Sequence, residues 1–208
     1  MHLKRQRATT KLPIPRKGTK FVARALSNYD NSVPVVIALR DMLKLARTAN
    51  EVKKMINQKI LKINGRVVRD YRESISIFNI LEAGKTYSLS LLNTGKFVLE
   101  EAKHKNMRLC KVIDKKILKN KVVQLNLHDG SNVISKENIA VGDSVYLDFE
   151  GKIKKHVSLQ KGKEAFIISG KYIGLKGKIE SIEGKKVNIL VEKLDKSVNL
   201  EKEIIVAE

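Results

Sequence analysis

The stretch Ile60–Arg69 reads Ile-Leu-Lys-Ile-Asn-Gly-Arg-Val-Val-Arg, with apolar and basic residues on each side of a central Asn-Gly pair. Asn-Gly is the strongest short signal for a β-hairpin, because both central residues of a type I′ turn need a positive φ. The stretch therefore predicts two short antiparallel strands that turn at Asn64 and Gly65 and carry cations on both sides of the turn.

Two helices are predicted immediately before this hairpin. Ser32 can cap the first helix and Pro34 suits its first turn. Its apolar stripe is formed by Val35, Leu39, Met42 and Ala46, with Val36 and Leu43 beside it. A Thr-x-x-Glu capping box at Thr48 and Glu51 announces the second helix, whose inward residues are Val52, Met55 and Ile56. Helices and hairpin together predict a compact αα-ββ unit that extends to about Leu92.

Cations occupy the faces of this unit that the apolar pattern leaves open. Arg40, Lys44 and Arg47 recur at i, i+4 and i+7 and should share one face of the first helix. The second helix and the hairpin add Lys53, Lys54, Lys59, Arg66 and Arg69. A surface that serves only to keep the protein soluble would mix both signs of charge. The excess of positive charge on these faces therefore favours binding to a polyanion over an ordinary helical hairpin with a solvated basic face.

The first 31 residues are predicted to form a basic, extended arm. Pro13 and Pro15 prevent a continuous helix there. Residues 1 to 29 hold no acid and eight basic residues: Lys4, Arg5, Arg7, Lys11, Arg16, Lys17, Lys20 and Arg24. The alternative is a disordered tail that only solubilises the chain, but Phe21, Val22 and Leu26 indicate that part of the arm packs.

After residue 100 the sequence changes to short β-branched runs separated by turns. The predicted strands are 109–113, 122–127, 144–149, 166–169, 178–182 and 187–191. The turns fall at Asp129-Gly130, Gly142-Asp143, Glu150-Gly151 and Glu183-Gly184. Strands at this spacing, with no long helix between them, predict small β-barrels.

A glycine-bearing run near the end carries Gly170, Lys171, Gly174, Lys176, Gly177 and Lys178. It is a poor match to a phosphate-binding loop, because such a loop opens a helix and strand residues follow here. The run resembles a KOW motif, whose small residues let the backbone turn sharply and approach RNA or a protein closely. A purely structural corner of a barrel is the alternative, and the two readings are compatible.

The overall charge indicates the kind of partner. The 208 residues contain 42 Lys and Arg against 22 Asp and Glu, a net charge of +20. Lysine and arginine that neutralise phosphates release counterions, so nucleic acid is the leading partner. No segment is apolar enough to span a membrane, the first residues lack the apolar core of a secretory signal, and the single cysteine, Cys110, indicates a reducing compartment.

We expect no metal, cofactor, small-molecule substrate or catalytic site. His2, His104, His128 and His156 are scattered without ligand spacing, and His128-Asp129 lies where a hairpin needs its turn. Cys110 lies in an alternating strand and reads as core filler. The aromatic residues Tyr71, Tyr87, Tyr146, Tyr172 and Phe97 are too dispersed to stack bases, so recognition should rely on phosphates and RNA shape.

The hairpin with its preceding helices resembles the RNA-binding module of bacterial small-subunit ribosomal protein four, pseudouridine synthases and tyrosyl-tRNA synthetases. Along nearly the whole chain, a series of motifs resembles the archaeal and eukaryotic small-subunit ribosomal protein of the "four-e" type. The motifs are those at 2–5, 13–21, 39–46, 64–70, 109–113 and 124–130, followed by the KOW run. Leu12, Asn50 and Lys59 depart from the family pattern, and without a glycine at 59 we expect Asn57 to be the left-handed residue that ends the second helix.

The resemblance implies a non-enzymatic structural constituent of the small ribosomal subunit, in the cytoplasm, that binds 16S-type rRNA beside neighbouring ribosomal proteins. The predicted fold class is α+β and multidomain: an arm (1–31), a helix-hairpin RNA-binding domain (32–95), a central β domain (96–163) and a KOW-motif β-barrel domain (164–208). Two alternatives remain at this point. An RNA-modifying enzyme with the same module would need a large catalytic domain, and a translation or stress factor would bind RNA only transiently.

Overall fold

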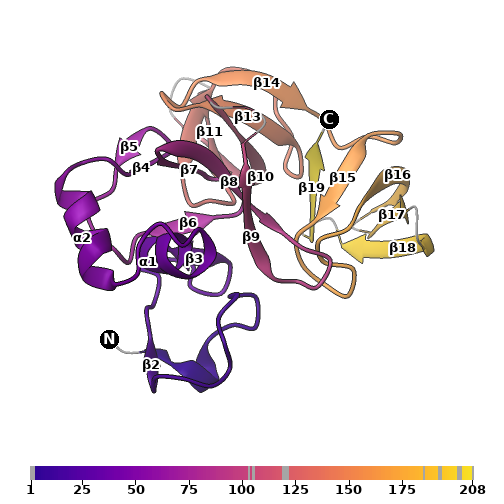
Figure 1. Ribbon diagram of the computed structural model, residues 1–208. Helices are drawn as coiled ribbons and strands as arrows, with labels where there is room; N and C mark the ends of the chain where they lie inside the picture. The colour runs from indigo at the N-terminus through magenta and orange to yellow at the C-terminus, as the bar shows by residue number, and fades with distance from the viewer. Residues whose placement is uncertain are drawn as a thin grey trace. The chain divides into compact units, whose positions relative to one another are not determined.

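The computed structural model describes residues 3–102, 104, 106–118, 122–184, 186–191, 194–200 and 203–207, and His2 lies outside them. The chain forms two compact units, Met1–Lys105 and Asn106–Glu208 (Figure 1). Both are built mainly from antiparallel strands, and helical segments are few in the described part of the chain. The predicted α+β class is therefore too rich in helix, and the described fold is mostly β.

The first unit is organised around a five-stranded antiparallel sheet of order β5-β4-β7-β8-β9. Its strands are β4 (Lys62–Ile63), β5 (Arg66–Val67), β7 (Ile80–Ala83), β8 (Lys85–Leu91) and β9 (Phe97–Glu101). Between β4 and β5, Asn64 and Gly65 have φ of 50° and 77°. These values confirm the hairpin predicted from the Asn-Gly pair, because a type I′ turn needs both.

The segment predicted as the first helix begins as a strand. β3 (Ser32–Pro34) pairs antiparallel with β6 (Ser74–Ser76), so Ser32 is a strand residue and not a helix cap. The helix is limited to α1 (Val35–Ile37) and a π-helical turn, η2 (Ala38–Met42). All five residues from Val35 to Leu39 are buried. A helix that is apolar all round is a core element, and the expected amphipathic helix to Ala46 is not formed.

The second predicted helix is confirmed as α2 (Ala49–Asn57). Thr48 Oγ1 accepts a hydrogen bond from the Glu51 backbone N–H at 3.3 Å, as the capping box requires. Val52 and Ile56 are buried and Met55 is partly buried. The local sequence therefore predicts where α2 starts and which face it buries.

The arm is folded back on itself, which corrects the predicted extended arm. β1 (Leu3–Lys4) pairs antiparallel with β2 (Phe21–Val22), and the 3-10 turn η1 (Arg5–Arg7) follows β1. The rest of the first unit holds the arm through backbone hydrogen bonds from Phe97 to Lys11 (2.8 Å) and from Leu26 to Arg72 (3.0 Å). Of the three residues expected to pack, Val22 is partly buried, whereas Phe21 and Leu26 are 46% and 57% exposed, so the expectation is wrong for those two side chains.

The second unit contains two five-stranded antiparallel sheets. The first has the order β12-β11-β10-β13-β14, with β10 (Met107–Ile117), β11 (Val123–Leu127), β12 (Asn132–Ser135), β13 (Ser144–Asp148) and β14 (Ile153–Val157). The second has the order β18-β17-β16-β15-β19, with β15 (Glu164–Ile167), β16 (Lys176–Glu183), β17 (Lys186–Val191), β18 (Leu194–Leu200) and β19 (Ile204–Ala207). All six strands predicted after residue 100 are present.

The two sheets of the second unit have separate apolar clusters but are joined by hydrogen bonds. Cys110, Val112 and Leu125 are buried in the first cluster, and Ile167, Ile179 and Ile189 in the second. Lys111 on β10 is buried and donates from Nζ to the Ile204 carbonyl at 2.7 Å. Ser144 Oγ on β13 accepts from the Val206 N–H at 3.1 Å. These bonds tie β19 to the first sheet.

Candidate nucleic-acid interface

Arg5 closes the folded loop of the arm from the inside. Its guanidinium donates to the Pro15 carbonyl (2.6 Å), the Thr19 carbonyl (2.7 Å) and Thr19 Oγ1 (2.9 Å). A Cβ on Gly18 would lie 3.0 Å from Arg5 Cζ, so this glycine packs directly on the guanidinium. Arg5, predicted as a phosphate ligand, therefore uses three of its five N–H donors to hold the loop in shape.

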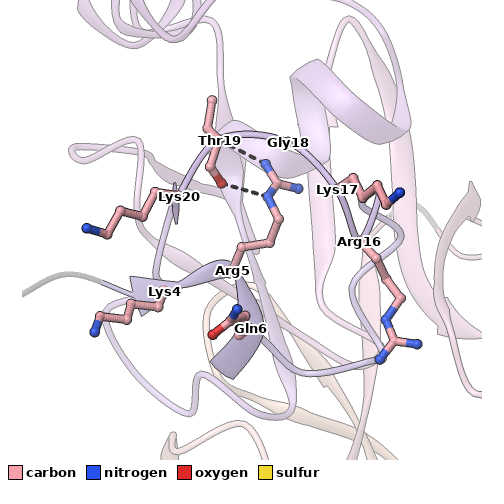
Figure 2. Close-up of a pocket in the computed structure, with 8 residues that line it drawn as sticks. All are labelled: Lys4, Arg5, Gln6, Arg16, Lys17, Gly18, Thr19 and Lys20. Atoms are coloured by element: carbon pink, nitrogen blue, oxygen red, sulfur yellow. Dashed lines mark hydrogen bonds between the residues drawn. The ribbon is translucent and has the colours of Figure 1, made fainter.

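The loop encloses a hollow of about 470 Å³, which we call the arm hollow. Its lining is Lys4, Arg5, Gln6, Arg16, Lys17, Gly18, Thr19 and Lys20. Figure 2 shows Lys4 and Lys20 pointing to one side of the loop, and Arg16 and Lys17 on the other side of Arg5. The lining contains five cations and no carboxylate. Such a concave, one-signed surface concentrates an anionic ligand.

The remaining arm cations are placed differently. Arg7 is exposed on η1. Lys11 donates from Nζ to Asn31 Oδ1 at 2.5 Å, and burial lowers the pKa of Lys11 against the attraction of Asp30. The Arg24 guanidinium lies 4.8 Å from the centre of the Tyr29 ring. Lys11 and Arg24 therefore contribute to the packing of the arm.

Arg40, Lys44 and Arg47 do not share a helix face, because η2 ends at Met42. Lys44 has a φ of 56°, and the Leu45 N–H donates back to the Leu39 carbonyl at 2.9 Å. Arg40 forms two hydrogen bonds with Asp41, at 2.7 and 3.0 Å, which raise the pKa of Arg40. Lys44 and Arg47 are exposed beyond the helix end.

The cations of α2 lie on its outer side, as predicted. Lys53 and Lys54 are exposed, and Lys53 Nζ lies 5.1 Å from the centre of the Tyr71 ring. The Arg72 guanidinium lies 5.5 Å from the same ring and forms an ion pair with Asp70 at 3.1 Å. Two cations on one ring make a cation–π cluster. Its member Arg72 was missed by sequence reasoning, although it follows an aromatic residue directly.

The end of α2 gives a first testable prediction. Lys59, not Asn57, is the left-handed residue, with a φ of 57°. Its N–H bonds to the Ile56 carbonyl, and the Ile60 N–H bonds to Met55, which is a Schellman motif. Because glycine adopts this conformation without a Cβ penalty, Lys59→Gly should raise the free energy of unfolding by about 1 kcal/mol.

Chemical denaturation of the full chain measures this effect. Lys59→Ala is the matched control, since it removes the same charge but keeps a Cβ in the left-handed position. It should not stabilise the chain. An equal gain from both variants would assign the effect to charge repulsion rather than to backbone strain.

The hairpin residues are held mainly by the chain itself. Asn64 exchanges two hydrogen bonds with Ile80, one through its backbone N–H and one through Oδ1, each at 2.9 Å. Arg66 Nη2 donates to Glu73 Oε2 at 2.7 Å, and the buried Glu73 also accepts from the Arg69 N–H at 2.7 Å. Gly65 and the Arg69 side chain are exposed. Asn64 therefore sets the hairpin, while Arg66 and Arg69 carry charge at its surface.

The glycines of the KOW run shape the second sheet of the second unit. A Cβ on Gly177 would lie 2.3 Å from the Leu190 carbonyl oxygen, so β16 and β17 approach too closely for any other residue. Gly170 and Gly174 have φ of 88° and 81°. Lys171, Lys176 and Lys178 are exposed around them. Gly177 therefore fits the interpretation of this run as a structural corner of the barrel. The three lysines place positive charge on the surface around it.

The groups considered as possible catalysts are structural. Burial raises the pKa of the Cys110 thiol, and the nearby Asp129 carboxylate adds to the effect. Asp129 accepts from the Ser131 N–H at 2.9 Å and forms an ion pair with Arg108 at 3.3 Å. His128 Nδ1 accepts from the Lys111 N–H. A thiol held neutral and a carboxylate engaged in turn bonds cannot act as nucleophile and base.

Neither a metal site nor a membrane span is found among the residues that the structure describes. No group of three or more His, Cys, Asp and Glu side chains there is arranged to hold a metal ion. No helix in that part of the chain has the length and apolarity needed to cross a membrane.

The chain is similar to known ribosomal proteins in sequence. The model of the ribosomal family S4e matches residues 83–153, and the KOW motif matches residues 161–192. The chain is 32% identical to the small ribosomal subunit protein eS4 of Methanocella arvoryzae, over 88% of this chain and 81% of that protein. It is 31% identical to the eS4 of Methanocaldococcus jannaschii, over 89% and 83%.

A solved structure shows the same similarity. The crystal structure of the 30S ribosomal protein S4e from Thermoplasma acidophilum superposes with a TM-score of 0.73 and 26% identity. The match covers 85% of this chain and 95% of that one. The family model and the archaeal relatives agree with this structural match. The chain therefore belongs to the ribosomal S4e family, and it is a structural ribosomal protein rather than an enzyme.

Proposed function

We propose that this chain binds folded small-subunit rRNA of the 16S type and stabilises it, beside neighbouring ribosomal proteins, in the cytoplasmic small subunit that carries out translation. The observation that supports the proposal best is the arm hollow, whose lining holds five cations and no acid. Phosphate contacts of this kind fix the position of a protein on RNA without reading sequence. Folded rRNA would be stabilised because cations reduce the repulsion between its phosphates.

Exposed cations outside the arm extend the proposed contact surface. They are Lys44, Arg47, Lys53, Lys54, Arg66 and Arg69, all in the first unit. We assign α1, η2, α2 and the β4–β5 hairpin to one RNA-binding module within residues 32–95. The arm (1–31), a central β domain (to 163) and a KOW domain (164–208) complete the proposed division. Because β9 pairs with β8, we begin the central domain after residue 105 rather than at 96. The lysines of the KOW run lie in the last domain and would contact RNA or a neighbouring protein.

The proposal predicts that rRNA binding depends less on salt when the cations of the arm hollow are replaced by neutral residues. Lys4, Arg16, Lys17 and Lys20 would all be changed to Gln in the full chain. Each phosphate contact releases about one counterion, so the slope of log K against log salt should become shallower by about 3 to 4. Filter binding to transcribed 16S-type rRNA over a salt series measures this slope.

A matched variant removes the same charge from cations that already have a carboxylate partner. Lys62, Lys85, Lys152 and Lys154 form ion pairs with Glu82, Glu101, Glu150 and Asp148. Changing these four to Gln should alter the slope by less than about 1. An equal change in both variants would show that only net charge matters, and the hollow would lose its role.

Sedimentation in high salt separates an integral component from a transient factor. Phosphate contacts weaken as salt rises, so a factor held mainly by them should wash off. An integral component should remain with purified small subunits, because contacts with folded rRNA and neighbouring proteins that do not depend on salt add to the phosphate contacts. Release at moderate salt would favour the factor instead.

A further inference from the structure

The β1–β2 ribbon of the arm has two chemically different faces. Directly paired residues of antiparallel strands point to the same side. Leu3 pairs with Val22, and Lys4 pairs with Phe21. Leu3 is buried and Val22 is partly buried, so this pair faces inward. Phe21 is 46% exposed beside Lys4 on the outer face.

Two lysines are neighbours of Phe21. Lys20 Nζ lies 5.6 Å from the ring centre, and Lys4 is the cross-strand partner. Both lysines line the arm hollow and point to the same side of the loop (Figure 2). An exposed aromatic side chain is therefore placed at the edge of a site for anions, on a loop that Arg5 holds in shape.

A nucleotide combines the two chemical features that this edge can bind. Its phosphate is an anion, and its base is a flat π-system that stacks on aromatic side chains. In a duplex both faces of the base are covered by neighbouring bases, so only an unpaired nucleotide can offer one. The Lys4, Lys20 and Phe21 side chains therefore fit unpaired RNA better than a helix.

We propose that the arm hollow holds the phosphates of an unpaired RNA segment while Phe21 stacks against one of its bases. The inference rests on the proposed rRNA binding and specifies the part of the RNA that the arm contacts. It also adds an aromatic contact to recognition that the sequence alone assigns to phosphates and shape.

Fluorescence of Phe21→Trp in the full chain tests the stacking directly, since the natural sequence contains no Trp. Single-stranded hexaadenylate should quench the emission in a saturable way, because a stacked base quenches an indole. Heparin, which has charge but no bases, should bind without comparable quenching. A blunt RNA duplex should behave like heparin. Equal quenching by all three probes would overturn the proposal.

A second Trp position controls for unspecific quenching. Ile134 is 66% exposed on β12, a strand with no residue assigned to RNA contact, so Ile134→Trp reports unspecific contacts. Hexaadenylate should leave its emission nearly unchanged. Similar quenching at both positions would show that bases stack wherever an indole is exposed, which contradicts a specific site.

Affinity measurements separate stacking from charge. Phe21→Leu should weaken hexaadenylate binding about tenfold, since stacking on one aromatic ring has this size, and should leave heparin binding within about twofold. Phe21→Tyr keeps a ring and should bind as the natural chain does. Loss in Phe21→Leu for both probes would indicate a damaged ribbon instead of a lost stack.

The outcomes also distinguish this inference from the proposed function. If the chain binds 16S-type rRNA with a steep salt dependence but Trp at position 21 is not quenched by hexaadenylate, stacking is wrong and rRNA binding stands. If rRNA itself does not bind, the proposed function fails together with the inference.

Discussion

Arg108→Met is expected to lower the free energy of unfolding by about 3–5 kcal/mol, the usual cost of removing one partner of a buried ion pair. Arg108 Nη1 lies 3.3 Å from Asp129 Oδ2, and the two side chains are 12% and 2% exposed. Methionine preserves much of the aliphatic bulk but leaves the Asp129 charge without its cation. Urea denaturation of the full chain, followed by circular dichroism, measures the loss.

The same pair predicts an acid dependence of stability. Burial by itself would raise the pKa of the Asp129 carboxyl, but attraction to Arg108 and hydrogen bonds from Ser131 outweigh it and hold the pKa below its ordinary value. A depressed folded-state pKa stabilises the fold above the unfolded pKa, near pH 4 for Asp. This contribution is lost as pH falls through the folded value.

Two variants act as controls for the buried pair. Adding Asp129→Asn to Arg108→Met should recover part of the stability, because the unpaired charge is removed, and should reduce the acid dependence. Lys152→Met breaks an exposed pair with Glu150 and should change stability very little. A loss in Lys152→Met as large as that in Arg108→Met would mean that burial is not the cause.

Gly177→Ala is expected to destabilise the second sheet of the second unit by about 3 kcal/mol, at the upper end of the usual cost of overpacking. The added Cβ would lie 2.3 Å from the Leu190 carbonyl oxygen and 2.7 Å from Ile189 Cγ2. The first of these contacts is with backbone, so β16 and β17 would have to separate. Thermal denaturation and hydrogen exchange of the β17 amides report this separation.

A second glycine substitution provides the comparison. Gly184 has a φ of 61° and open space where its Cβ would lie, and asparagine tolerates this conformation better than most residues. Gly184→Asn should therefore cost much less than Gly177→Ala. Equal losses would attribute the effect to backbone conformation and not to the close approach of β16 and β17.

Local signals in the sequence predict the turns and many of the strands. Asn64-Gly65 needs only its own dihedral preference, and Thr48 with Glu51 caps α2 through neighbouring groups. The strands after residue 100 follow from β-branched runs between turns, since each run has a short, well-marked boundary. These elements depend little on distant residues.

The elements that the sequence predicts wrongly depend on distant contacts. Ser32–Pro34 looks like a helix start, but its backbone pairs with Ser74–Ser76, and no local pattern encodes that partner. The i, i+4, i+7 spacing of Arg40, Lys44 and Arg47 implies one face only if the helix continues. It stops at Met42, where the π-helical turn leads into a left-handed Lys44.

The candidate site also combines features that local sequence predicts with features that depend on distant contacts. Clustered cations in the first 31 residues identify the region, because charge density can be read directly from the sequence. The fold of that region is not readable, since it requires Arg5 to reach Pro15 and Thr19 across the loop. Phe21 becomes a candidate for stacking only because β1 and β2 bring it beside Lys4.

If the arm binds RNA as proposed, its closure by Arg5 in the unbound chain has a thermodynamic consequence. Segments that fold as they bind bury additional apolar surface and show a large negative heat capacity change, together with a substantial ordering cost. Here Leu3 and Leu12 are already packed in the unbound chain. Calorimetry of the association should therefore give a small heat capacity change, and a preformed arm should not slow the encounter with a folding step of its own.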